Sequence, residues 1–513
     1  MNSIPRFLFA ALALAAALLA TPRPLFADDW PMFGRDHSRN PVSPEKNPPL
    51  DWNDKTGKNI KWRAEVGCGQ FSAPVSSPIV ANGLVWIGTN NGQPRDASIT
   101  GEAGVLMCFR ESDGKFLYQH ISPQQKGPTY SWTWVGINSS PLVEGDRLWF
   151  TTSLAEILCL DIGPLQQGSG TPQELWKLDM IKDLGISPPF GRMGGGPLCS
   201  IGASYGDLIY VITANGVTWG PDYKDIRVRA PDAPDLVCLN KNTGKVVWRD
   251  SSPGKDIIRG EYGNPLIIEV NGRAQVVAPQ GDGWLRSFDA LTGELIWKFD
   301  INPKSAGQHR AWSSESADYF MSAPVLYEGK LYIGSGQYVE LGEGTGRLCC
   351  IDPSRRGDIS LELEDGPGQG KPNPNSGEVW HFDKIGRTMS TVAIHDGLVI
   401  AVGVSGVVYC LDAKTGRQHW HHDLPGGNLS QSSPLIVDDK VYVCDVDDII
   451  HIFGLSRDKL AFAENEAGDS YEITGSPVFA NGTLYFVVGS SLYAIQEGHT
   501  TPPPPKEAAG AKP

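Results

Sequence analysis

The chain has 513 residues, which is too long for one ordinary core unless the fold is a repeat array that grows by adding units. Its 59 Gly and 39 Pro favour many short strands joined by turns over long amphipathic helices. The formal net charge of -14 and the pI of about 5.2 argue against binding of nucleic acid through a general basic surface, and no cluster of Lys and Arg stands out in the sequence.

Residues 1–27 have the pattern of an export signal. Arg6 supplies the positive start, and the apolar stretch 7–20 is too short to span a bilayer comfortably. Cleavage after Ala27 fits the pattern, although Leu25 makes the small-x-small site imperfect. No cysteine follows the apolar stretch as an attachment point for a lipid, and no later segment is apolar for long enough to cross a membrane. We therefore expect a mature protein that is not membrane-embedded and is periplasmic or secreted.

Residues 28–54 are predicted to form an extended N-terminal segment, and residues 55–497 a single repeat domain. Each repeat opens with Ser/Gly-x-Pro and an apolar run, then has a turn and an alternating strand. A third strand, a Thr-Gly turn and a fourth strand carrying Trp follow. Alternation at period two is typical of strands with one packed face. Four short antiparallel strands per unit predict an all-β fold, an eight-bladed β-propeller whose units begin near Ser76, Ser139, Gly194, Gly263, Ser322, Ser390, Ser432 and Gly475.

The Thr-Gly and Trp of each repeat are expected to join neighbouring blades. Gly allows the unusual backbone angle of a tight turn between the third and fourth strands. The Trp is then expected to point between blades and to cover the turn of the next one, where its large aromatic area stabilises the seam.

The ring is predicted to close through its N-terminal strand. The last unit ends at SLYAIQ without a Thr-Gly-Trp strand, whereas KTGKNIKWRAEV from Lys55 has that strand with no unit before it. Pairing of the strand around Trp62 with the last blade removes both free edges of the ring. Residues 498–513, which are rich in Pro, are predicted to be a disordered tail.

The cysteines are interpreted as buried thiols rather than disulfides. Five of them occupy equivalent positions in successive third strands, where a small apolar residue packs well: Cys108, Cys159, Cys238, Cys350 and Cys410. The adjacent Cys349 and Cys350 could form a strained vicinal disulfide, and the sequence leaves their redox state open.

Two units carry insertions between their third and fourth strands, DIGPLQQGSGTPQELWKLD and EDGPGQGKPNPNSGEVWHFD. Both are expected to be exposed loops on one face, where propellers vary. Simple tolerance of insertion is favoured over a binding role.

These repeats resemble the pyrroloquinoline-quinone (PQQ) propeller family from about Trp62 to Gln496. The strand pattern is clearest at 243–248, 292–297 and 415–420, and DWPMFGRDHSRNPVSPEKNPP at the start is similar to the beginning of exported PQQ-like propellers. The family contains quinoprotein dehydrogenases as well as outer-membrane assembly factors of the BamB kind, which have the fold without the cofactor. The resemblance therefore implies the fold and leaves the chemistry open.

A dehydrogenase of this family needs a base, calcium ligands, a flat aromatic and cations for the quinone at the mouth of the channel. We expect these groups in the loops that enter the first strands, because first strands line the axis. The polar and aromatic residues of those loops are Gln70, Trp132, Trp134, Asn138, Arg192, Glu261, Asn264, Trp312, Glu315, Asp318, Arg387, Asn428 and Gln431.

Roles follow from the side chains, with no residue-by-residue match to the dehydrogenases. Asp318 and Glu315 are the candidate catalytic residues, and Glu261 and Asn264 the candidate calcium ligands. The candidate PQQ-binding residues are Trp134, Arg192, Glu261, Asn264, Trp312 and Arg387. The competing interpretation, which we favour, is a wet channel whose polar groups bond to each other or to water.

Other signals are weaker. His419, His421 and His422 alternate along an outer strand, so they are expected to point to different faces rather than to hold a metal. DVDD at Asp445 is interpreted as a polar turn rather than a calcium loop. No Cys-x-x-Cys-His occurs, so an attached c-type haem is excluded, and no Gly-x-Gly-x-x-Gly supports nicotinamide chemistry.

The sequence is therefore interpreted as an exported binding or scaffold propeller, with no certain cofactor and with an unknown protein or a small polar ligand as its partner. We expect it to be a monomer. The alternative is a PQQ- and calcium-dependent alcohol dehydrogenase that passes electrons to a separate carrier. An envelope-assembly role like that of BamB is disfavoured by the missing lipidation cysteine.

Overall fold

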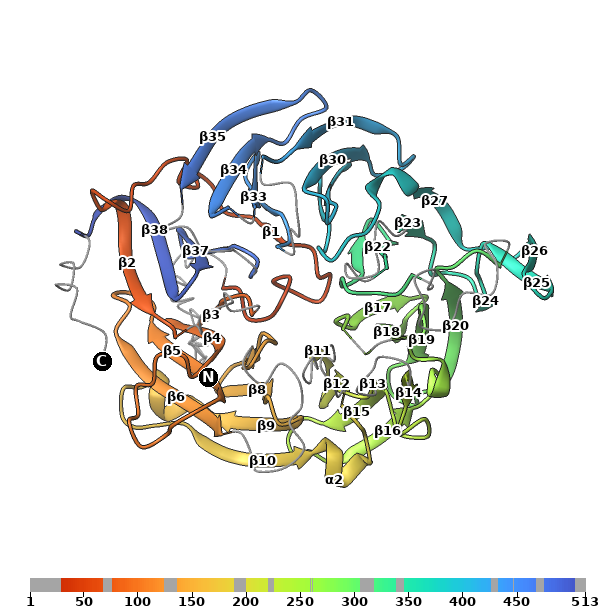
Figure 1. The fold of residues 1–513 in the computed structure, drawn as a ribbon, viewed down its shortest axis with the longest axis horizontal. Coiled ribbons are helices and arrows are strands. Elements are labelled where there is room, and N and C mark those ends of the chain that lie inside the picture. The colour runs from red at the N-terminus through yellow and green to blue at the C-terminus, as the bar shows by residue number, and fades with distance from the viewer. Residues whose placement is uncertain are drawn as a thin grey trace, which may run out of the picture.

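The elements form a closed ring of eight sheets, the blades of a β-propeller (Figure 1). The predicted fold class and blade number are confirmed. The structure is a computed structural model that describes residues 29–67, 76–123, 136–188, 200–219, 226–258, 260, 262–304, 318–337, 346–425, 432–445, 447–466 and 475–502. The predicted export signal, residues 1–27, lies outside these ranges, and so do residues 503–513 of the predicted tail.

The first four blades each contain four antiparallel strands in chain order from the axis outward. Blade 1 has β3 (Ile79–Ala81), β4 (Leu84–Asn90), β5 (Ala103–Arg110) and β6 (Phe116–Pro123). Blade 2 has β7 (Leu142–Glu144), β8 (Arg147–Thr151), β9 (Glu156–Asp161) and β10 (Gln173–Asp179). Blade 3 has β11 (Ser200–Tyr205), β12 (Leu208–Ile212), β15 (Leu236–Asn240) and β16 (Val246–Asp250), with a hairpin of β13 (Val217–Trp219) and β14 (Ile226–Val228). Blade 4 has β17 (Leu266–Val270), β18 (Arg273–Pro279), β19 (Trp284–Asp289) and β20 (Leu295–Asp300).

The last four blades repeat this arrangement. Blade 5 has β21 (Val325–Tyr327), β22 (Lys330–Gly334), β23 (Leu348–Ile351) and β27 (Glu378–Phe382). Blade 6 has β28 (Ala393–His395), β29 (Leu398–Val402), β30 (Val407–Asp412) and β31 (Gln418–Asp423). Blade 7 has β32 (Leu435–Val437), β33 (Lys440–Cys444), β34 (Ile449–Gly454) and β35 (Leu460–Glu466). Blade 8 has β36 (Val478–Ala480), β37 (Thr483–Val488), β38 (Ser491–Thr500) and, from the N-terminus, β2 (Lys58–Glu65).

The predicted ring closure is confirmed. β2 pairs antiparallel with β38, and Trp62 lies opposite Ala494 in the ladder. In Figure 1 the red-orange β2 lies beside the blue β38. Because β2 completes a blade made otherwise of the last three strands, the two ends of the chain are joined by a sheet.

The Trp of the repeat joins neighbouring blades as predicted. At five seams its indole N–H donates to a backbone carbonyl in the turn of the next blade, at 2.8–3.0 Å. At four of these seams the ring lies on the turn glycine, where an added Cβ would come within 2.6–2.7 Å. These glycines also have positive φ, so the turn needs Gly for two reasons. The Trp–Gly pairs are Trp62–Gly114, Trp176–Gly244, Trp248–Gly293 and Trp380–Gly416.

The two insertions are more ordered than simple loops. The insertion of blade 2 contains the short helix α1 (Gly163–Gln166), and α2 (Met180–Leu184) follows β10. The insertion of blade 5 contributes β24 (Gly357–Asp358), which pairs parallel with β20 of blade 4, and a hairpin of β25 (Glu362–Gly366) and β26 (Gln369–Pro372). This hairpin projects beyond the ring in Figure 1. Two 3₁₀ turns, η2 (Gly254–Asp256) and η5 (Asp383–Ile385), complete the elements used below.

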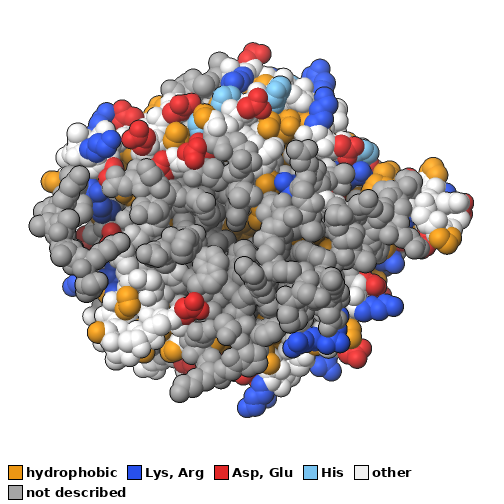
Figure 2. Space-filling model, in the orientation of Figure 1, with side chains coloured by type: hydrophobic (Ala, Val, Ile, Leu, Met, Phe, Trp, Pro, Cys, Tyr) orange, Lys and Arg blue, Asp and Glu red, His pale blue; other side chains and the backbone are white. Residues whose placement is uncertain are grey.

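The cysteines of the third strands are buried free thiols, as predicted, and the same holds for Cys349 and Cys444. Burial raises the pKa of each third-strand thiol, for example that of Cys159 to about 12. Charged side chains of both signs are distributed around the rim (Figure 2). No helix in the described part of the chain is both long enough and apolar enough to cross a bilayer.

Candidate functional site at the axis of the propeller

The N-terminal segment makes one circuit of the ring, a feature that the sequence did not predict. Residues 30–45 contact successive blades, and most contacts are hydrogen bonds to first strands. Trp30 pairs with Val80 of blade 1, Pro31 O accepts from Val143 of blade 2, and Ser38 O accepts from Leu326 of blade 5. The other contacts around the ring are made by Met32 (blades 2 and 3), Arg39 (Pro265, blade 4), Asn40 (Ile394, blade 6), β1 (Val42–Ser43, paired with β32 of blade 7) and Glu45 (Asn481 and Gly482, blade 8).

Arg39 is the charged group of this segment at the axis. Its side chain is fully buried, and it donates to the carbonyls of Phe33 at 2.5 Å and of Pro265 at 3.2 and 3.3 Å. Burial lowers the pKa of Arg39 to about 9, against the opposing effect of Asp36. Arg39 thus fixes the segment to blade 4 through neutral acceptors.

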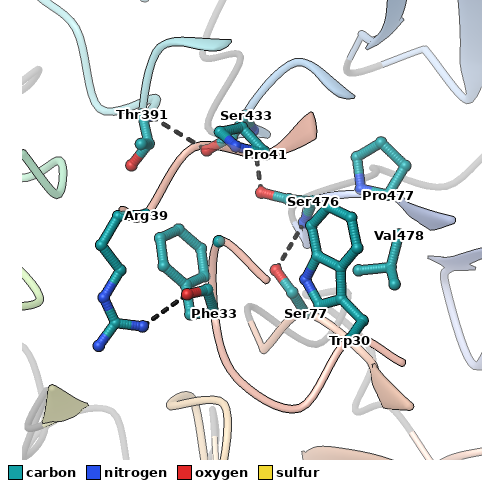
Figure 3. A pocket seen from close by; sticks show the side chains of 11 residues that line it. Trp30, Phe33, Arg39, Pro41, Ser77, Thr391, Ser433, Ser476, Pro477 and Val478 are labelled. Carbon is teal, nitrogen blue, oxygen red and sulfur yellow. Dashed lines mark hydrogen bonds between the residues drawn. The ribbon is translucent and has the colours of Figure 1, made fainter. Parts of the chain in front are cut away.

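Hydroxyl groups at the start of the first strands form a belt around the axis. A backbone N–H of one blade donates to a Ser or Thr hydroxyl of the next, at 2.9–3.1 Å, from blade 5 through blades 6, 7, 8 and 1 to blade 2. Figure 3 shows three of these bonds, which link Thr391, Ser433, Ser476 and Ser77. The second residue of the repeated Ser/Gly-x-Pro thus ties neighbouring blades together.

The belt and the N-terminal segment together close one end of the channel. Trp30, Phe33, Arg39 and Pro41 lie against the hydroxyl belt in Figure 3. The cavity left between them has a volume of about 10 Å³, room for about one water molecule. The segment bonds to the first strands and to the turns that follow them, as at Asn481.

Four of the predicted site residues are described: Asn138, which lies before blade 2, and three that have assigned roles, Asn264, Asp318 and Arg387. The remaining candidates with assigned roles, Trp134, Arg192, Glu261, Trp312 and Glu315, lie outside the described residues, as do Gln70, Trp132, Asn428 and Gln431.

Asp318 lies at the seam between blades 4 and 5. The side chain of Asn302 brackets its backbone: Asn302 Nδ2 donates to Asp318 O, and Asp318 N donates to Asn302 Oδ1, both at 2.9 Å. The Asp318 carboxylate is 6% exposed and accepts from Ser335 Oγ at 3.4 Å. The residue is therefore held by the scaffold at both its main chain and its side chain.

Arg387 reaches the same place from blade 6. A Cβ added to Gly336 would lie 2.7–3.1 Å from the backbone and stem of Arg387, and Gly336 pairs with Tyr319, the neighbour of Asp318. The structure thus brings Asp318 and Arg387 to the adjoining residues Ser335 and Gly336.

Asn264 lies before β17 of blade 4. The adjacent Gly263 faces Ser322 of blade 5, whose carbonyl would be 3.0 Å from an added Cβ. Asn264, Asp318 and Arg387 therefore come from three consecutive blades.

The described candidates do not amount to a calcium or quinone site. Among the described residues no three His, Cys, Asp or Glu side chains come together in a way that could hold a metal ion. Asn264 and Asp318 supply two oxygen-bearing side chains, whereas calcium takes six to eight oxygen ligands. The predicted aromatic partners of the quinone, Trp134 and Trp312, are not among the described residues.

A buried polar network beside this site was missed by the sequence analysis. Arg286 makes a two-pronged ion pair with Asp282, at 2.9 and 2.6 Å, and also donates to Gln280 Oε1. Gln280 Nε2 donates in turn to Asp250 of blade 3. The signal was the presence of Asp282 and Arg286 inside QGDGWLRSFD, a buried strand and turn.

Asp235 is the unusual member of this network. Its Oδ1 accepts from Asn215 at 3.4 Å, and its Oδ2 is buried without a hydrogen-bond partner. Burial, reinforced by Asp250 and Asp282, raises the pKa of Asp235 well above the usual carboxyl value.

The two weaker sequence signals are resolved as predicted. His421 stacks on Tyr409 of blade 6, whereas His422 contacts His451 and Phe453 of blade 7, so the histidines point to different faces. Asp445 forms a polar turn, because its Oδ1 accepts from the N–H groups of Asp447 and Ile449.

Comparison with known proteins gives one family. A family model described as "Outer membrane protein assembly factor BamB" matches residues 162–359 and 371–461, which is more than half of the chain. The chain is also 21% identical over 221 residues to a tetrathionate hydrolase of Acidithiobacillus ferrooxidans. That match covers 41% of this chain and spans 37% of the length of the hydrolase.

Two solved structures share the fold. BamB from Moraxella catarrhalis has 14% sequence identity and a TM-score of 0.53, over 85% of this chain and 99% of that chain. The quinohemoprotein alcohol dehydrogenase ADHIIG from Pseudomonas putida HK5 also has 14% identity, with a TM-score of 0.50, over 95% of this chain and 83% of that chain. At this identity the likeness shows the fold alone.

Proposed function

We propose, from the premise that this chain belongs to the PQQ-like β-propeller family described by the BamB model, that it is an exported binding or scaffold protein. The observation that carries the proposal is the circuit of residues 30–45 over all eight blades. The chain uses its own N-terminal segment to close one end of the channel, which leaves the opposite end as the face for a partner.

The polar groups described at that face support binding more than turnover. Asp318, the candidate base, has a backbone bracketed by Asn302 and a carboxylate that accepts a hydrogen bond from Ser335. A general base needs an acceptor that reaches the proton it removes. The Asp318 carboxylate already accepts a hydrogen bond from within the protein, which is typical of a rigid binding surface.

Export to the periplasm or the cell exterior is part of the proposal, and its support is the pattern of residues 1–27. We also propose a monomer, since β2 and β38 close the ring within one chain and leave no blade incomplete. Fractionation of cells and the mass in solution test these two points.

Reconstitution tests the enzymatic alternative. Purified residues 28–513 are titrated with PQQ and calcium, and the absorption spectrum and dye reduction with a panel of alcohols are recorded. We expect no bound quinone and no turnover. Turnover that Asp318→Asn abolishes would replace the binding proposal with a dehydrogenase.

Site-directed photo-crosslinking in cell-envelope fractions tests binding directly. A crosslinker replaces Asn138, before blade 2, and the matched control carries it at Lys414, in a turn at the opposite end. A reproducible product from Asn138 that the Lys414 control lacks is expected. If Asn138 gives no reproducible product, the scaffold proposal fails.

A further inference from the structure

Three seams lack the contact between Trp and the next turn within the described residues: those of blades 1 and 2, of blades 4 and 5, and of blades 7 and 8. In blade 5 the insertion that begins at Asp352 replaces the turn that Trp297 of blade 4 would cover. Trp297 is fully buried, and its indole N–H has no hydrogen-bond partner in the described part of the chain. At the seam of blades 7 and 8, Trp52 of the N-terminal segment packs on Phe486 instead, with ring centroids 5.6 Å apart.

The seams of blades 4 and 5 and of blades 7 and 8 each carry a pocket. At the seam of blades 7 and 8 the pocket is acidic, with Asp54, Glu464 and Glu466 in its lining. At the seam of blades 4 and 5 a pocket of about 160 Å³ is basic instead, although the chain as a whole has a net charge of -14. Its lining consists of Val270, Asn271, Arg273, Gln275, Ile296, Ser354, Arg355 and Arg356.

The three arginines of the basic pocket differ in their partners. Arg273 is fixed by Asp289, at 2.5 Å, and by Glu294, at 2.8 Å. Arg355 and Arg356 are exposed, and no ion pair or hydrogen bond of either guanidinium occurs within the described ranges. Three cations face two carboxylates, so the pocket keeps an excess of positive charge.

A buried amide adds a neutral donor. Gln275 is 3% exposed and lines the pocket, and its Oε1 accepts from Ser287 Oγ at 2.7 Å. Its Nε2 group has no partner in the part of the chain that the structure describes. An oxygen atom in the pocket can accept a hydrogen bond from this amide group.

The loop that carries Arg355 and Arg356 is held at its C-terminal end. Gly357 pairs with Trp297 through the β20–β24 ladder, and Asn375 Nδ2 donates to the carbonyls of Arg356, at 2.8 Å, and Asp358, at 3.1 Å. A site fixed in advance loses less conformational freedom when its ligand binds.

We propose that this pocket binds a tetrahedral oxyanion, a phosphate or sulfate group. Planar guanidinium groups with several N–H donors match the oxygens of such a group, and the unused amide of Gln275 supplies a further hydrogen bond. The inference is independent of the proposed function, because the pocket lies at the seam of blades 4 and 5 and shares no residue with the candidate site at the axis.

Binding of inorganic phosphate and inorganic sulfate to the purified protein tests the inference. Isothermal titration is carried out at constant ionic strength with chloride as the balancing salt, because screening weakens exposed charges. The test variant is Arg355→Gln/Arg356→Gln. Its charge-matched control is Arg249→Gln/Arg417→Gln, which removes two exposed arginines from blades 3 and 6.

We expect millimolar or tighter binding of at least one of the two anions, with affinity about tenfold weaker for each arginine removed at the pocket and unchanged in the control. Gln275→Glu should abolish binding, because it places a negative charge against the anion. The inference is overturned if the Arg355→Gln/Arg356→Gln variant binds with equal affinity. It is also overturned if neither anion binds and the protein does not bind the vesicles described next.

Vesicles distinguish a free anion from a lipid headgroup. Co-sedimentation compares vesicles containing phosphatidic acid with pure phosphatidylcholine. If the protein binds the phosphatidic acid vesicles and the Arg355→Gln/Arg356→Gln variant does not, the oxyanion site is supported and its ligand is a lipid headgroup. This conclusion holds even if the inorganic anions do not bind. Binding that both double variants retain contradicts it.

Discussion

The indole ring of Trp62 lies against Gly114, so that β2, which completes the last blade, covers the turn of the first blade. An added Cβ at Gly114 would lie 2.6 Å from the ring, and the indole N–H donates to Glu111 O at 2.8 Å. The same contact recurs at other seams. A substitution at one of these glycines therefore measures how much the Trp–Gly contact contributes to the stability of a seam.

Gly114→Ala should destabilise the protein by about 2–5 kcal/mol, because it combines a positive φ with a steric clash. Gly329→Ala is the matched control, since Gly329 has φ 72° and nothing within 4 Å of its added Cβ. The control should lose only about 1–2 kcal/mol. Denaturant unfolding measures both variants, and equal losses would show that the Trp–Gly contact contributes nothing.

Glu65→Cys/Ser491→Cys should form a disulfide between β2 and β38, because these two residues are partners in the ladder. The bond closes a loop of most of the chain, so it should raise the free energy of unfolding by up to about 4 kcal/mol. A shift on a non-reducing gel shows the bond, and reduction provides the control. If the disulfide forms but the unfolding midpoint is unchanged, the ring does not open first between β2 and β38.

Asn40→Ala tests the circuit of the N-terminal segment. Asn40 Nδ2 donates to Ile394 O at 2.7 Å, and its Oδ1 accepts from Ile394 N at 2.8 Å. Loss of both bonds should cost about 1–3 kcal/mol. Proteolysis should then begin within residues 30–45, which N-terminal sequencing of the first fragments can locate; first cleavage elsewhere would argue against the segment as the weakened element.

Asn302→Ala and Asp318→Asn should differ in their effects. Asn302 satisfies both backbone groups of Asp318, so its loss should destabilise the seam of blades 4 and 5 by about 1–3 kcal/mol. Asp318→Asn keeps the bracket and should change stability little. Thermal unfolding measures both variants. A larger loss of stability in Asp318→Asn than in Asn302→Ala would show that the carboxylate, rather than the two backbone hydrogen bonds, stabilises this seam.

Asp235→Asn should stabilise the protein increasingly as the pH rises. Burial raises the pKa of Asp235, so the folded protein retains a proton that the unfolded chain loses from about pH 4 upward. Between the unfolded and folded pKa values the stability of the wild type therefore falls with pH, and the variant lacks this fall. Unfolding midpoints of both proteins across acidic to neutral pH give the comparison; parallel curves would contradict the raised pKa.

The blades and their seams could be predicted from the sequence because their determinants are local. A turn glycine and a Trp a few residues later recur within each repeat, and Trp62 without a preceding unit matched the last blade without a final strand. The position of Asp318 and Arg387 on consecutive blades also followed from the repeat, because each lies before a first strand.

The circuit of residues 30–45 could not be predicted because each of its contacts involves a different blade. No period appears in such a segment, and its visible signal was limited to the apolar Trp30, Met32 and Phe33 in a polar stretch. The bracket of Asn302 on Asp318 and the meeting of Arg273 with Arg355 and Arg356 arise between blades, where linear spacing carries no information.

Glu65 pairs with Ser491, 426 positions later in the chain. β2 is therefore synthesised early but can pair only after the last strand has been made. The first folded segment to leave a ribosome or a translocation pore has no partner until the final blade has emerged. The intermediate is an open arc with two bare edges, and folding of this chain depends on keeping those edges apart until the last strand arrives.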